Sequence, residues 1–106
     1  MSMLKLAEIE KQTLIPGTDV RFVHSEHMTL AYWNFDADVP FPEHAHPHEQ
    51  VTNVIEGVFD LTVDGETMRL RAGSVVVIPS NASHWGRSIT ACRIMDVFHP
   101  VREDYR

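Results

Sequence analysis

Histidine side chains that could bind a metal ion are concentrated in residues 42–50, which read Pro-Glu-His-Ala-His-Pro-His-Glu-Gln. On a β-strand, His44 and His46 point to the same side, because successive side chains alternate between the two faces. Two imidazoles aimed at one point can share a metal ion, and imidazole is the commonest metal ligand in proteins. The competing interpretation is a proline-rich loop that carries histidines without binding a metal.

Two further residues can complete such a site. Gln50 can begin the next strand with its amide facing the same point. His84 follows the turn-forming run Pro-Ser-Asn-Ala-Ser, which can bring a later strand back across the site. His24, His27 and His99 show no comparable pairing, and we expect them at the surface.

The elements that must position these side chains are β-strands, since short apolar or alternating runs lie between turn residues along the chain. The clearest turn is Asp64-Gly65, because a two-residue hairpin loop needs positive φ angles and glycine adopts them at little cost. A strand about every ten residues with almost no helical pattern indicates an all-β sandwich or barrel. The predicted strands are Val20–His24, Met28–Phe35, Val51–Ile55, Val58–Val63, Thr67–Leu70, Ser74–Ile78 and Ala91–Phe98.

Length and charge narrow the class of protein. The 106 residues suit one domain, and a net charge of −6 without a basic run argues against a nucleic-acid partner, which would need clustered cations. No stretch approaches the roughly 20 apolar residues that span a bilayer, and the first residues lack the apolar core of a signal peptide. The single cysteine, Cys92, cannot form an intrachain disulfide, so we expect a cytoplasmic protein. Residues 1–106 are predicted to form one domain, with residues 1–17 as an arm that contacts a partner subunit.

The last predicted strand places a carboxylate among apolar side chains. Cys92, Ile94, Asp96 and Phe98 alternate with a second set of residues, and this face reads as the interior of the barrel. A buried carboxylate is costly unless it is paired or hydrogen-bonded. Asp96 therefore either faces solvent or pairs with Arg93 or Arg69, or it is a proton-transfer group beside the metal.

Two spaced motifs resemble those of the cupins. His44-x-His46, Gln50 and Gly57 are similar to the first cupin motif, and Gly73, Pro79 and His84 are similar to the second. The resemblance implies a small cupin β-barrel, a jelly roll or double-stranded β-helix. Three positions depart from the family pattern: Asp38 and Asn81 stand where glycine is usual or frequent, and Gln50 replaces the usual glutamate. Asparagine tolerates the left-handed conformation better than most residues.

The cupin resemblance also implies a ligand set for one divalent metal ion, namely His44, His46, Gln50 and His84. All four ligands are neutral, so the ion would keep its full charge and act as a strong Lewis acid. Nitrogen-rich ligation suits Ni, Zn, Fe, Co or Mn better than Ca or Mg. The sequence does not choose among these transition metals.

The C-terminal run from Asp96 to Tyr105 resembles that of small pectin-degradation cupins, which linearise 4,5-unsaturated galacturonate to its keto form. This resemblance implies a metal-dependent isomerase in which Asp96, Phe98 and Arg102 line the pocket. A carboxylate can move the protons, and a guanidinium can bind the planar carboxylate of a sugar acid through two hydrogen bonds. Without the resemblance, Arg102 reads as an exposed residue of a charged tail.

Two alternative functions remain open at this stage. An iron-dependent cupin dioxygenase would use the same ligands for oxygen chemistry, and a non-catalytic sugar-binding or regulatory cupin would use the metal only to shape the pocket. We also expect a homodimer, because small cupins commonly dimerise and a sheet face bearing Trp and Phe, together with Leu4 and Leu6, could pair across a two-fold axis.

Overall fold

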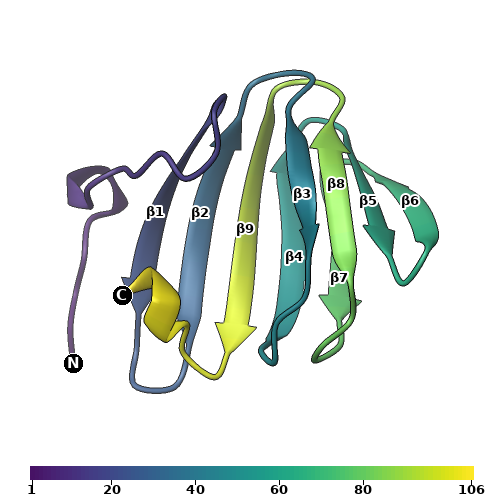
Figure 1. The fold of residues 1–106 in the computed structure, drawn as a ribbon. Coiled ribbons are helices and arrows are strands. Elements are labelled where there is room, and N and C mark those ends of the chain that lie inside the picture. The colour runs from purple at the N-terminus through teal and green to yellow at the C-terminus, as the bar shows by residue number, and fades with distance from the viewer.

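The computed structural model describes residues 1–106, which form nine β-strands and two short 3-10 helices (Figure 1). The strands are β1 Thr18–His24, β2 Thr29–Phe35, β3 Pro40–His44, β4 Glu49–Glu56, β5 Phe59–Val63, β6 Glu66–Leu70, β7 Val75–Ile78, β8 His84–Ser88 and β9 Cys92–His99. The helices are η1 Leu6–Glu8 and η2 Glu103–Tyr105. The all-β prediction is confirmed. No helix of the structure is both long and apolar enough to cross a membrane.

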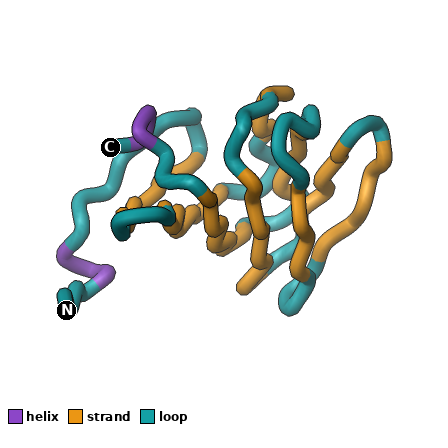
Figure 2. Tube along the Cα trace, turned by 90° about the horizontal axis from the view of Figure 1, so that it is seen from below, coloured by secondary structure: helices purple, strands orange, loops and turns teal.

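The strands form two antiparallel sheets. One has five strands in the order β1-β2-β9-β4-β7, and the other has four in the order β3-β8-β5-β6. The late strand β9 lies between β2 and β4, so the last part of the chain occupies the middle of the larger sheet. Both termini and both helices lie away from the β5–β6 hairpin (Figure 1, Figure 2).

Alternation along the strands produces the core between the sheets. In β2 every second residue, from Thr29 to Phe35, is buried, and β9 buries Cys92 and every second residue up to Phe98. Aromatic rings fill the centre: Trp33 lies 5.6 Å from Phe35 and 5.5 Å from Phe41 between ring centroids. Trp33 and Phe35 are packing residues inside the subunit. Dimer contact through an open sheet face stays a prediction.

Two strands beside the site were not predicted. Strand β3 contains Pro40 and Pro42, which usually argue against a strand, but β3 is an edge strand, where a missing N–H donor is tolerated. Strand β8 is short and polar, and its residues alternate between buried and exposed. Because β3 ends at His44, the prediction that His44 and His46 share one strand is wrong; His46 lies in the connection to β4.

Residues with positive φ angles lie where the sequence predicts a turn or where the family favours glycine. Asp64 and Gly65, with φ angles of 47° and 83°, form the predicted hairpin turn between β5 and β6. Asp38 and Asn81, the two positions where the family favours glycine, also have positive φ angles of 62° and 65°. These polar residues thus keep the left-handed conformation that the pattern requires.

The N-terminal arm packs on its own subunit. Gln12 forms a β-bridge with Val20, and Nε of Arg21 donates a hydrogen bond to the Ile9 carbonyl at 3.1 Å. These contacts place Leu14 and Ile15 beside the site described below. Contact of the arm with a partner subunit stays a prediction.

Candidate metal centre and adjoining pocket

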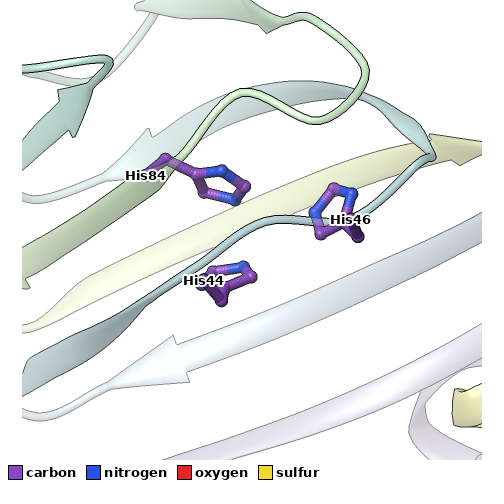
Figure 3. Close-up of side chains that lie close together, drawn as sticks. All are labelled: His44, His46 and His84. Atoms are coloured by element: carbon purple, nitrogen blue, oxygen red, sulfur yellow. The ribbon is translucent and has the colours of Figure 1, made fainter.

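Three histidines from two segments of the chain, His44 and His46 from one and His84 from the other, converge between the sheets (Figure 3). His44 ends β3, His84 begins β8, and the two residues are register partners in the sheet, which brings their ring centroids to 4.1 Å. His46 approaches from the following connection, with its ring centroid 5.1 Å from that of His84. One ring nitrogen from each histidine lies within 4.8 Å of the others, close enough for all three to bind one ion.

Backbone carbonyls orient all three rings. The Nδ1 atoms of His44, His46 and His84 lie 2.9 Å from the Pro42 carbonyl, 3.0 Å from the His48 carbonyl and 2.9 Å from the Ala82 carbonyl, respectively. A carbonyl only accepts, so each Nδ1 carries the proton and each Nε2 keeps a free lone pair. Nε2 of His84 is buried with no hydrogen-bond partner. Metal-binding histidines typically donate one ring N–H to a carbonyl or carboxylate and bind the ion through the other nitrogen. The three histidines share this arrangement, and the cluster therefore fits a transition-metal ion.

Gln50 presents an oxygen to the same space. Its Nε2 donates to Oγ1 of Thr52 at 2.9 Å, which turns its Oε1 to 3.0 Å from Nε2 of His46. Both of these atoms are lone-pair acceptors when Nδ1 of His46 holds the proton. Neighbouring ligands of one ion at bond lengths of about 2.1 Å and right angles lie about 3.0 Å apart. The separation thus fits two ligands of one ion.

The electrostatics keep these histidines neutral. Burial lowers the pKa of His44, His46 and His84, in the last case to about 4, and the positive charge of Arg102 lowers all three further. Neutral imidazole is the metal-binding form, so no proton competes for these nitrogens at neutral pH.

Asp96 lies in the interior, as the alternation of β9 predicts, next to the histidine cluster. Its Oδ1 is buried without a hydrogen-bond partner. Burial raises the pKa of Asp96 to about 6, although the polar side chains of Thr52, Gln50 and Trp33 oppose the rise. The alternative interpretations, a solvent-facing Asp96 or a pair with Arg93 or Arg69, are wrong: Arg69 binds Asp60, and Arg93 lies 3.7 Å from Glu56.

Arg102 is buried, so its interpretation as an exposed tail residue is also wrong. Its guanidinium carbon lies 4.8 Å from the centroid of the Phe98 ring and 4.1 Å from that of Tyr105. Nε and Nη2 donate to the two carboxylate oxygens of Asp104 at 3.0 and 2.7 Å. Nη1 is buried with no partner. The paired donors expected to bind a ligand carboxylate are therefore already occupied, and Nη1 is the free one.

These residues surround two adjoining cavities. The inner cavity has a volume of about 40 Å³, and the outer cavity has a volume of about 340 Å³. The inner cavity is lined by polar and aromatic side chains that include Gln50, Thr52, Asp96 and Phe98. The outer cavity is lined by Leu14, Ile15, His46 and Arg102, among others. The residues that line both cavities are Trp33, Phe41, His44 and Tyr105.

Six of these lining residues had no predicted role in the site, namely Leu14, Ile15, Trp33, Phe41, Thr52 and Tyr105. For Trp33 a signal was present: it is one of the inward-facing alternate residues of β2, and a buried indole needs a partner for its N–H. For Tyr105 the signal is its place at the end of the C-terminal run.

Known proteins share the fold of this chain. Two solved structures are similar over the whole chain: an RmlC-like cupin from Shewanella frigidimarina, with a TM-score of 0.94, 27% identity and 96% of that chain covered, and KdgF from Halomonas sp., with a TM-score of 0.93, 26% identity and 99% of that chain covered. The polyketide synthase CurC of Streptomyces cyaneus is 38% identical over 58 residues, which are 54% of this chain and 38% of CurC. The chain thus matches well under half the length of this curated relative. The family profile described as Cupin domain matches residues 31–98, and the chain belongs to the cupin family.

Proposed function

We propose that the protein is a metal-dependent isomerase that opens the ring of a 4,5-unsaturated uronate to its linear keto form. The observation that carries the proposal is the buried carboxyl of Asp96, with an unpartnered oxygen, in the cavity that His44, His84 and Gln50 also line. The C-terminal run that resembles small pectin-degradation cupins and the similarity to the KdgF structure support the choice of substrate.

His44, His46, Gln50 and His84 would hold one divalent transition metal ion, with Ni, Zn, Fe, Co and Mn as candidates. When bound, the ion would supply positive charge that stabilises negative charge developing on sugar oxygens. Carbonyl contacts at each Nδ1 hold the three rings ready for it without rearrangement.

The reaction is an internal transfer of atoms that needs no oxidant. The anomeric hydroxyl loses its proton, the bond from the anomeric carbon to the ring oxygen breaks, and an aldehyde forms. The electron pair released onto the ring oxygen forms a carbonyl with the double-bond carbon that carries this oxygen, and the other carbon of the double bond takes up a proton. Asp96 accepts the first proton and returns one to carbon. Its pKa of about 6 suits a group that must both take and give a proton near neutral pH.

Arg102 and Phe98 position the sugar acid. Nη1 of Arg102 is a free donor for one carboxylate oxygen of the ligand, and Asp104 holds the rest of the guanidinium in place. Phe98 supplies an apolar surface between Asp96 and Arg102, beside the sugar ring. The ligand therefore meets a positive charge at one end and the proton-transfer group at the other.

The test follows the ultraviolet absorbance of 4,5-unsaturated galacturonate mixed with the purified protein, with and without a chelator. We expect the absorbance of the conjugated double bond to disappear only with metal-loaded protein, and to do so equally under argon. Asp96→Asn should retain the metal and lose at least about 100-fold in kcat, in line with the usual contribution of a general acid–base group. A dioxygenase would stop under argon, and a binding protein would leave the absorbance unchanged; either result refutes the proposal.

A further inference from the structure

Two polar atoms in the inner cavity have no hydrogen-bond partner although they are buried: the indole Nε1 of Trp33 and Oδ1 of Asp96. Trp33 is 3% exposed and Asp96 is 8% exposed. Buried polar groups in folded proteins are nearly always hydrogen-bonded, so an unpaired donor and an unpaired acceptor in one cavity point to a missing partner.

The two residues are held on one face of the sheet. Trp33 on β2 is the register partner of Ile94 on β9, and Asp96 is the partner of Ala31, so Trp33 and Asp96 are diagonal neighbours on the inner face. Both side chains line the inner cavity. Phe35 and Phe41 pack against the indole ring and fix its direction.

The chemistry of the two atoms defines what can join them. An indole N–H only donates, and a carboxylate only accepts. A hydroxyl group satisfies both, because its oxygen can accept from Trp33 while its proton is donated to Asp96. An ether or carbonyl oxygen would satisfy only Trp33, and a cavity of about 40 Å³ has room for a group of this size.

We propose that Trp33 and Asp96 together bind one hydroxyl group of the ligand, and that Trp33 thereby selects ligands carrying a hydroxyl at that position. The inference rests on the proposed function for the identity of the ligand, where the hydroxyl is the anomeric one that loses its proton. Trp33 then fixes the hydroxyl oxygen while Asp96 takes its proton, which makes Trp33 a specificity-determining residue that touches the substrate.

The experiment uses saturated galacturonate, which has the hydroxyl but lacks the double bond, and metal-loaded protein. The chain has only two tryptophans, Trp33 and Trp85, so the ¹⁵N-labelled protein gives two indole N–H signals in NMR spectra. Trp33→Phe and Trp85→Phe assign the signals. Trp85 also lines the inner cavity but is 44% exposed, so its substitution is the matched control for an indole that water can reach. Metal content and circular dichroism check that Trp33→Phe remains folded and loaded.

We expect galacturonate to shift the Trp33 signal by more than the Trp85 signal, because only Trp33 is proposed to donate to the ligand hydroxyl. Trp33→Phe should raise the Kd for galacturonate about tenfold relative to the wild-type protein. The methyl glycoside of galacturonate, which lacks the hydroxyl proton, should bind the wild type and Trp33→Phe equally weakly. A Trp33 signal that does not move with galacturonate, or an unchanged Kd in Trp33→Phe, overturns the inference. Failure of the proposed function is a separate result: galacturonate moves the Trp33 signal, but the unsaturated uronate is not consumed.

Discussion

Arg102 and Asp104 form a two-point ion pair within the C-terminal tail: Nε and Nη2 of Arg102 donate to the two carboxylate oxygens of Asp104 at 3.0 and 2.7 Å. Asp104 approaches from the solvent side, with 57% of its side chain exposed, whereas the side chain of Arg102 is only 6% exposed. The pair holds the guanidinium in one orientation and leaves Nη1 free. In the proposed function, Asp104 would affect the ligand through the orientation of Arg102.

Asp104→Asn should therefore weaken ligand binding more than turnover. Loss of the two charge-assisted hydrogen bonds lets the guanidinium turn, and we expect KM for the unsaturated uronate to rise about tenfold with little change in kcat. Glu103→Gln is the matched control, because Glu103 pairs with Arg106 at 3.0 Å and makes no contact with Arg102. Steady-state kinetics on the wild type and both variants measure KM and kcat. An equal KM in Asp104→Asn and the wild type would contradict the positioning role of Asp104.

The same pair predicts a pH dependence of stability. A hydrogen bond from Arg102 holds the pKa of Asp104 below its ordinary value of 3.8. A depressed carboxyl pKa in the folded state contributes stability above the unfolded pKa, and this contribution is lost as the pH falls through the folded value. The difference in thermal midpoint between wild type and Asp104→Asn should be constant above about pH 5 and shrink below about pH 4. Thermal scans across this range measure it; a difference that grows with acid would refute the assignment.

Removal of a cluster histidine should remove the metal. His84→Ala takes away the buried Nε2 that has no other partner, and we expect most of the bound ion to be lost on dialysis. His27→Ala is the control, since the side chain of His27 is 74% exposed and is not a member of the cluster. Elemental analysis per chain gives the result, and full occupancy in His84→Ala would exclude His84 as a ligand.

Gly86 allows β8 to approach β5 closely. A Cβ at this position would collide with the Phe59 ring and would lie 2.8 Å from the Asp60 carbonyl. Gly86→Ala should lower the free energy of unfolding by about 1–3 kcal/mol, the usual effect of overpacking. Arg87→Ala, at the next and exposed position, should cost less than about 1 kcal/mol, because it removes only the surface pair with Asp38. Urea denaturation compares the two, and equal effects would refute the steric explanation.

A row of aliphatic side chains crosses the outer face of the larger sheet. Successive register partners join Val23, Leu30, Val97, Val51 and Val77, one from each of the five strands. Val77 on the edge strand β7 is 60% exposed. We expect this face to pair with a second copy of the chain, as the predicted homodimer requires.

Val77→Lys should then convert the dimer to a monomer without loss of fold, because a lysine would bring an unpaired charge into the apolar contact. Light scattering coupled to gel filtration gives the mass in solution. Glu66→Lys on the other sheet is the control for an added positive charge, since Glu66 is exposed. A wild-type protein that is monomeric at micromolar concentration would refute the dimer itself.

Local sequence patterns predicted those features of the structure that depend only on neighbouring residues. The alternation of β9 placed Asp96 inside, and Asp64-Gly65 set a turn, because side-chain direction and backbone freedom are local properties. Strand β3 was missed because its prolines are tolerated only at an edge, and the strand order of the sheet is not a local property. The pairing of Arg102 with Asp104 was missed for a similar reason. The charged run alone predicts an exposed Arg102, and only the family resemblance placed it in the pocket, because Phe98 and Tyr105, which bury the guanidinium, are brought there by the fold.

Because β9 lies between β2 and β4, the order in which the strands are synthesised limits when the larger sheet can form. During synthesis, β2 and β4 exist long before the strand that must separate them, so the larger sheet cannot close until β9 has emerged. Pairings that are distant along the chain form slowly, because the loop must be closed before the contact is gained. Asp96, Phe98 and Arg102 arrive with or after β9, so the candidate site cannot be complete before the larger sheet closes.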